Sequence, residues 1–72
     1  MTKYTLRSTE LVYTPGIFAW VRNEYLFRKG WSIKFMRDTF GIKPSIAKQI
    51  LDPDFKYVVD KDNETVTFTI GE

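Results

Sequence analysis

The stretch Ser32–Leu51, SIKFMRDTFGIKPSIAKQIL, decides the fold that we expect for this chain. It predicts a helix over about 33–40 that Ser32 caps, a tight turn at Gly41, and a second helix over about 44–51 that a proline opens. Gly41 is expected to take the left-handed backbone conformation that glycine reaches without steric cost. The pattern is therefore typical of two short helices joined by a glycine turn.

Residues 55–70 have the clearest alternation of apolar and polar residues in the chain, which predicts a β-hairpin with strands over about 55–60 and 65–70. Because an isolated hairpin is only marginally stable in water, its apolar face is expected to cover the helices. Folding about residues 61–64 places three apolar pairs on one face: Val59 with Val66, Tyr57 with Phe68, and Phe55 with Ile70.

The first part of the chain predicts another helix, over about 15–29, with Thr14 as its cap and Gly30 as its stop. Residues 1–13 are β-branched and aromatic enough for a short N-terminal strand. The helix would be apolar on two sides, which indicates packing on both. One side holds Ile17, Phe18, Val21 and Tyr25; the other holds Trp20 and Phe27, which either join the core or form an interface with a second copy.

Composition limits the chemistry available to the chain. Its 72 residues suit one small α+β domain over 1–72, and they include no cysteine and no histidine. The usual zinc ligands, general base and thiol nucleophile are therefore missing, and no phosphate-binding glycine loop appears. We expect neither an enzyme nor a cofactor, metal or small-molecule substrate. No apolar run has the length of a membrane span, so we expect no membrane association and a cytoplasmic location.

Charge is unevenly distributed along the sequence. Residues 1–51 contain nine basic and three acidic residues, whereas residues 52–72 contain two basic and six acidic ones. A basic helical part followed by an acidic hairpin indicates one surface for a polyanion and another kept away from it. Chance segregation on a small surface is the other explanation.

The chain resembles the winged helix-turn-helix DNA-binding domains of small prokaryotic and phage regulators. The hairpin 55–70 stands where the wing of that family lies. The family's apolar frame is matched around the turn glycine, and a proline enters the next helix: Met36, Phe40, Gly41, Ile42, Pro44, Ala47 and Ile50.

This resemblance implies that the helix 44–51 enters the major groove of double-stranded DNA. The function implied is that of a small DNA-binding regulator of transcription, excision or replication, such as a phage or plasmid protein. A domain of this size is expected to act as a homodimer or with a partner protein. The positions carried over to the DNA surface are Lys34 and Arg37 on the first helix and Lys43, Ser45, Lys48 and Gln49 on the second.

Two departures from the family pattern keep an alternative open. Arg37 stands where the family usually has a small residue, so either the helices cross differently or its side chain bends outward. The expected wing tip, residues 60–64, is acidic where a DNA-reading wing offers Arg or Lys. The alternative is a protein-interaction module that contacts a host or partner protein through the acidic hairpin. In most helices, moreover, an outer face such as Lys48 and Gln49 is simply solvated.

Overall fold

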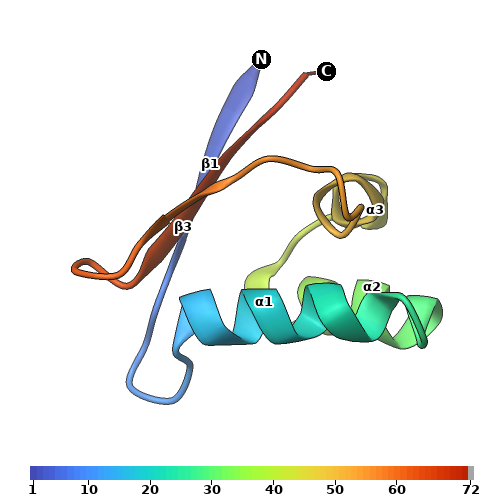
Figure 1. The fold of residues 1–72 in the computed structure, drawn as a ribbon, viewed down its shortest axis with the longest axis horizontal. Coiled ribbons are helices and arrows are strands. Elements are labelled where there is room, and N and C mark those ends of the chain that lie inside the picture. The colour runs from blue at the N-terminus through green and yellow to red at the C-terminus, as the bar shows by residue number, and fades with distance from the viewer. Residues whose placement is uncertain (72) are drawn as a thin grey trace. The chain divides into compact units, whose positions relative to one another are not determined.

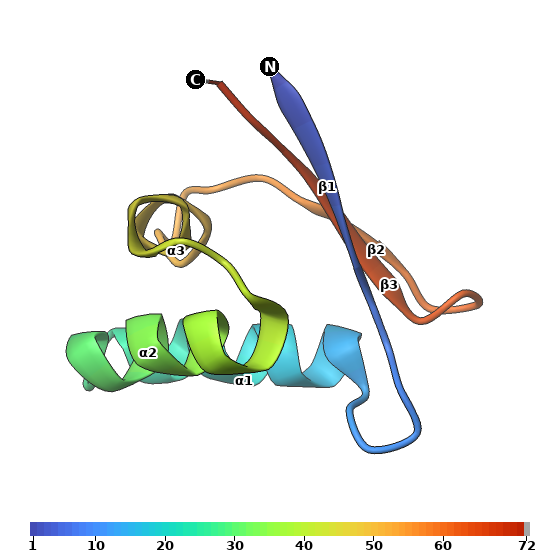
Figure 2. The same ribbon diagram turned by 180° about the vertical axis from the view of Figure 1, so that it is seen from behind.

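The computed structural model describes residues 1–71 and confirms the expected α+β class, with three helices and a three-stranded antiparallel sheet (Figures 1 and 2). The chain divides into two compact units. Unit 1 contains Met1–Phe18 and the chain from Lys56 onward, and unit 2 contains Ala19–Phe55. The elements are β1 (Thr2–Arg7), α1 (Thr14–Tyr25), α2 (Lys29–Phe40), α3 (Pro44–Ile50), β2 (Val58–Asp60) and β3 (Thr65–Ile70).

The sheet of unit 1 has the strand order β1-β3-β2, so the last strand lies in the middle. The N-terminal segment forms the expected short strand, and all six residues of β1 pair with β3. The predicted hairpin register is also confirmed, because Val59 pairs with Val66 across the turn at residues 61–64. The turn and the alternating residues thus predict the hairpin register, whereas the pairing of β1 with β3 comes from the structure alone.

The second strand is shorter than predicted, since β2 begins at Val58 and not near residue 55. The reason is that Phe55 belongs to the turn after α3, where its N–H donates to the carbonyl of Asp52 at 3.0 Å. Ile70, the partner predicted for Phe55, pairs instead with Thr2 of β1.

One face of the sheet carries the apolar core of unit 1. Leu6, Val66, Phe68 and Ile70 are buried. The Phe68 ring stacks on Tyr4 at 5.3 Å between centroids, and Phe18 meets Tyr57 edge-on at 4.8 Å. These contacts follow from the period of two, which sends alternate side chains to the same face.

The first helix starts where predicted but ends four residues early, at Tyr25 and not at 29. A turn over 26–28 follows, and α2 begins at Lys29, so Gly30 lies inside the second helix and does not stop the first. The turn is closed by the N–H groups of Phe27 and Arg28, both of which donate to the carbonyl of Glu24. Gly30 needs no unusual backbone angle, which is why it marks no boundary.

The two predicted hydroxyl caps are wrong. Ser32 lies within α2, fully buried, and Thr14 is the first residue of α1, also buried. Within the described residues 1–71, neither hydroxyl has a hydrogen-bond partner. The first N–H of α1 instead bonds a residue outside the helix: the Thr14 N–H donates to Oγ of Ser8, six residues earlier in the chain, at 2.9 Å.

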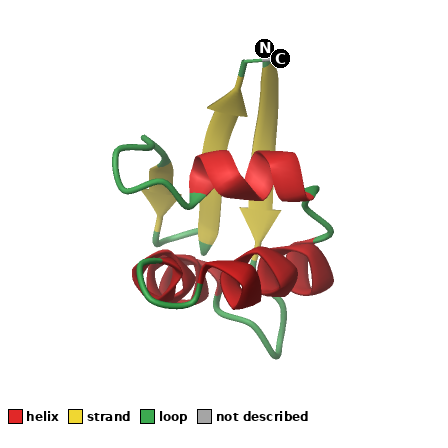
Figure 3. Cartoon of the chain, turned by 90° about the vertical axis from the view of Figure 1, so that its right-hand side faces the viewer, coloured by secondary structure: helices red, strands yellow, loops and turns green. Residues whose placement is uncertain are grey.

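The predicted pair of helices joined by a glycine turn is present in unit 2. Gly41 takes φ 69° and ends α2, with its N–H donating to the Arg37 carbonyl at 2.9 Å. Ile42 then returns to the core, and three residues separate the helices. In Figure 1 α2 lies across the view while α3 is seen end-on, and Figure 3 shows the same steep crossing from the side. Steeply crossed helices joined by a short glycine turn are typical of a helix-turn-helix.

Candidate nucleic-acid interface

The third helix has one buried and one solvent-exposed face, as predicted. Ile46, Ala47 and Ile50 are buried, because the spacing of three and four residues places them on one side. The opposite side presents Ser45, Lys48 and Gln49, all of them exposed. The Gln49 side chain folds back on its own helix, where Nε2 donates to the Ser45 carbonyl at 3.4 Å. The outer face thus offers one ammonium and two neutral polar groups.

Lys43 occupies the position immediately before α3 and brings a second ammonium to this surface. Its backbone is extended, with φ −62° and ψ 145°, and its carbonyl accepts the N–H groups of Ile46 and Ala47. The side chain is exposed and forms no cap. Pro44 follows at the first helical position, where a missing N–H costs nothing.

Lys34 and Arg37 lie three residues apart on the exposed side of α2, with Met36 buried behind them. The side chain of Arg37 is directed outward, which was one of the two outcomes expected for it: it is 57% exposed, and α2 packs on α3. Its Nε lies 3.3 Å from Oδ1 of Asp38, an exposed pair that contributes little to stability. The guanidinium therefore points to solvent and leaves the helix crossing undisturbed.

The structure thus brings all six predicted residues into one unit as exposed side chains on two packed helices and their turn. Among the residues described, no ion pair involves the ammonium groups of Lys34, Lys43 or Lys48. Their charge is therefore available to an anionic ligand. This arrangement can hold phosphates and present Gln49 and Ser45 to hydrogen-bonding groups.

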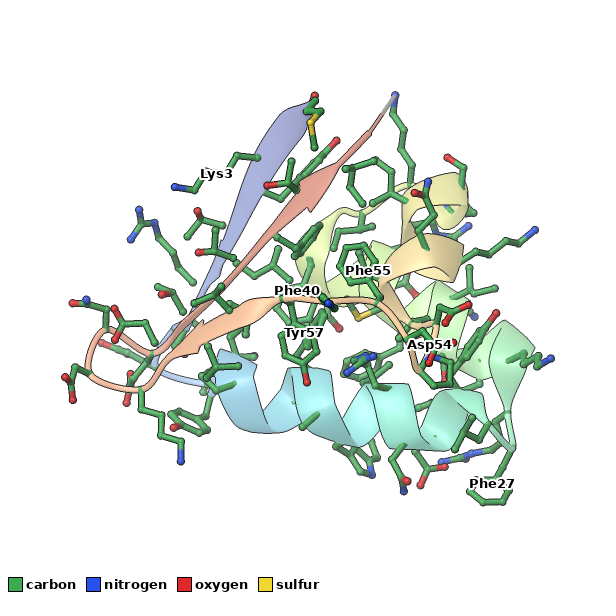
Figure 4. The ribbon with its side chains drawn as sticks, turned by 45° about the horizontal axis from the view of Figure 1, so that its top comes forward. Lys3, Phe27, Phe40, Asp54, Phe55 and Tyr57 are labelled. Atoms are coloured by element: carbon green, nitrogen blue, oxygen red, sulfur yellow. The ribbon has the colours of Figure 1, made fainter. Side chains whose placement is uncertain are left out.

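The far end of α3 has the opposite charge. Asp52 and Asp54 are exposed on the turn that follows the helix, and together with Gln49 and Phe55 they line a shallow hollow. Figure 4 labels Asp54 and Phe55 in this turn. The Asp52 carboxylate accepts the N–H of Asp54 at 2.8 Å, which holds the turn. A polyanion would therefore meet the Lys43 end of α3 and avoid the Asp52 end.

Arg22 plays a role that the sequence did not reveal. In the sequence it counts as one of the basic residues. In the structure its guanidinium donates hydrogen bonds to backbone carbonyls at the end of α3 and in the turn that follows. A helix leaves its last carbonyls unpaired, and a cation there also favours the helix dipole. Nε donates to Ile50 O at 3.1 Å, and Nη2 lies 2.7 Å from Asp52 O, 3.2 Å from Pro53 O and 3.4 Å from Phe55 O.

Two further cations of unit 2 lie over aromatic rings. The Arg28 guanidinium carbon is 4.4 Å from the centroid of Trp31 and its Nη2 is 2.9 Å from Oε2 of Glu24. The Lys29 ammonium stands 5.8 Å from the centre of the Tyr25 ring. No local sequence motif marks these contacts, because they depend on where the turn at 26–28 places the two helices.

Among residues 1–71 there is no group of three or more acidic side chains placed to hold a metal ion. In that same part of the chain, every helix is too short or too polar to cross a bilayer.

Comparison of the chain with protein-family models, with curated proteins and with solved structures finds no match. The exposed basic face of the α2–turn–α3 segment is therefore the feature of this chain that bears on function.

Proposed function

We propose that this protein is a small regulator that binds double-stranded DNA through the helix-turn-helix of unit 2. One observation carries the proposal: the exposed side of the α2–turn–α3 segment gathers Lys34, Lys43 and Lys48, which have no acidic partner among the described residues. A winged-helix arrangement, with β2 and β3 as the hairpin, is the finer fold that this proposal implies.

In the proposed complex α3 lies in the major groove. Lys43 and Lys48 contact phosphates or guanine acceptors, Gln49 pairs with adenine, and Ser45 bonds a phosphate or a base. The contact of Gln49 with the Ser45 carbonyl is long at 3.4 Å, so DNA can replace it at small cost. The acidic turn after α3 determines which end of the helix approaches the DNA backbone, since it repels phosphates from its own end.

A double substitution tests the proposal directly. Lys43→Ala/Lys48→Ala should weaken binding to random duplex DNA by at least about tenfold and reduce the slope of log K against log salt by about 2. Fluorescence anisotropy of a labelled duplex at several salt concentrations gives both quantities.

The matched control is Lys3→Ala/Lys61→Ala, which removes the same charge from exposed positions of unit 1. It should leave the salt slope unchanged. Equal slopes for the two double variants would show that binding depends on net charge alone, and absence of binding by the unaltered protein would remove the proposal.

A second candidate is a protein-interaction module, which the hairpin favours. Val58 is 67% exposed on β2, beside a turn that carries Asp60, Asp62 and Glu64. Exposed apolar residues next to carboxylates suit a basic partner protein. Binding that survives a several-fold rise in salt, and that is lost in Val58→Asp but kept in Lys43→Ala/Lys48→Ala, would favour this candidate.

A further inference from the structure

Unit 2 carries an aromatic cluster that the proposed DNA contacts do not use. We define it as Trp20 of α1 with Trp31 and Phe35 of α2. The Trp20 ring meets Trp31 edge-on at 5.3 Å between centroids and Phe35 at 5.8 Å, while Trp31 and Phe35 are 5.2 Å apart. Trp20 is nevertheless 43% exposed, while Trp31 and Phe35 are half-buried, so the cluster reaches the surface through Trp20.

A hollow adjoins this cluster along α2. It encloses about 270 Å³ and is lined by Trp31, Lys34, Phe35 and Asp38. That volume is near the lower end of those of clefts that hold small ligands. Its walls combine two aromatic rings with one ammonium and one carboxylate, which is a lining suited to a flat ring that carries hydrogen-bonding groups.

The rim of the cluster is positively charged. Each acidic side chain there already faces a cation: Glu24 pairs with Arg28, and Asp38 lies beside Arg37. Lys34 lines the hollow and adds positive charge, because among the described residues its ammonium forms no ion pair. A cationic ligand is therefore disfavoured at these rings, and an anionic ligand is favoured.

We propose that the aromatic cluster and its rim bind single-stranded DNA, with a base stacked on the exposed Trp20 ring and a phosphate held by Lys34. Exposed aromatic rings interleaved with basic side chains bind single strands because every base has a π-face and every linkage a negative charge. A second copy of this chain would bring the same positive rim to the contact, which opposes self-association through this face.

The two tryptophans of the chain, Trp20 and Trp31, both belong to the cluster. Intrinsic tryptophan fluorescence therefore reports on this surface alone, and α3 contributes nothing to it. Titration with an oligo-dT of about ten nucleotides should quench this fluorescence, because a stacked base deactivates the excited indole. The affinity obtained from this quench should fall as salt is raised. The slope of log K against log salt should be about −0.7 for each phosphate contact.

Two variants locate the site. Lys34→Gln leaves both indoles in place and should lower the affinity several-fold and the salt slope by about 0.7. Trp20→Leu should lower the affinity about tenfold, read from the remaining Trp31 signal. The matched controls lie in unit 1: Lys61→Gln and Tyr13→Leu change the same chemistry at exposed positions and should keep the parent affinity.

Three results would overturn the proposal. These are an absence of quenching by oligo-dT, equal affinities for the site and control variants, and an equal quench by a blunt duplex of the same length. A fluorescence change that depends on protein concentration without DNA would assign the surface to a second copy instead. An oligo-RNA arm that binds more tightly than oligo-dT would contradict the choice of DNA. The proposed duplex binding is tested separately, because Lys43→Ala/Lys48→Ala should lower the affinity for duplex DNA and leave the quench by oligo-dT unchanged.

Discussion

The two units stabilise their elements in different ways. In unit 1 the three strands are held by backbone pairing in a register that alternating residues already specify, as Val59 opposite Val66 illustrates. In unit 2 the end of α3 depends on a side chain from elsewhere in the chain, Arg22, whose acceptors lie 28 to 33 residues away. The difference teaches that local patterns specify a ladder well and a helix terminus poorly.

The largest effect that this comparison predicts is for Arg22→Met. The variant keeps much of the apolar stem but removes every guanidinium bond to the carbonyls after α3. Because bonds from a charged donor are stronger than neutral ones and the acceptors are left unpaired, we expect a loss of about 3 kcal/mol in the free energy of unfolding. Urea denaturation followed by circular dichroism measures it.

Arg37→Met is the matched control, since the only polar contact of this guanidinium among the described groups is with the exposed Asp38. It should change the free energy of unfolding by less than about 0.5 kcal/mol. A similar loss in both variants would mean that unit 2 does not depend on Arg22 in particular.

The two glycines of unit 2 provide the next test. Gly41→Ala should cost about 1–2 kcal/mol, because its φ of 69° is strained for any residue with a Cβ. Gly30→Ala should instead gain up to about 1 kcal/mol, since Gly30 sits in α2 at ordinary backbone angles. Neither added Cβ meets an atom within 4 Å, so packing cannot explain the difference. Thermal melts of the two variants should shift in opposite directions; shifts of the same sign would contradict this assignment.

Two serines, one in each unit, allow a comparison between a hydroxyl that forms hydrogen bonds and one that forms none with the described groups. Ser8 in unit 1 accepts the Thr14 N–H and donates to the Glu64 carbonyl at 2.7 Å, so Ser8→Ala should cost about 1 kcal/mol. Ser32→Ala should be neutral or slightly stabilising, because its buried hydroxyl has no partner among the described groups and alanine favours helix. A loss of about 1 kcal/mol in Ser32→Ala would instead restore the helix cap that the sequence predicted.

The sequence predicts those features that one residue type requires locally. A glycine at positive φ, a proline opening a helix and a period of two placed the α2–α3 turn, α3 and the hairpin register. Gly30 was predicted as a helix stop and Ser32 as a helix cap, and both predictions are wrong, because glycine and serine also occur inside helices. The exposed face of α3 followed from the spacing of its isoleucines.

The parts that could not be predicted depend on long-range placement. The end of α1 at Tyr25 is set by a turn that carries no Gly or Pro, and the aromatic cluster needs α1 and α2 to lie side by side. Arg22 looked like one more surface cation until the carbonyls after α3 were brought to it. The count of charged residues therefore predicts that the helical part is basic, but it does not predict what each arginine contacts.

The smallest effect concerns the turn of unit 1, where the Asp60 carboxylate bonds backbone groups of the turn, as Arg22 bonds backbone groups after α3 in unit 2. Asp60 accepts Nδ2 of Asn63 at 2.7 Å and the N–H groups of Asn63 and Asp62 at 3.1 and 3.0 Å. These bonds, that from the Asn63 side chain first, lower the pKa of Asp60 below its ordinary value of 3.8. A lowered folded-state pKa means that the stabilisation is present above pH 3.8 and is lost as the pH falls from there through the lowered value.

Asn63→Ala should therefore return the pKa of Asp60 toward 3.8 and flatten the acid limb of the stability profile. NMR titration of the Asp60 carboxyl carbon measures the pKa. Asn23→Ala, an exposed asparagine of unit 2, is the control that should leave this titration unchanged. Because Asp60 lies at the end of β2 and is only half-buried, the effect on folding should be the smallest of the four. An acid limb as steep in Asn63→Ala as in the parent would show that this turn, unlike the end of α3, depends on backbone pairing alone.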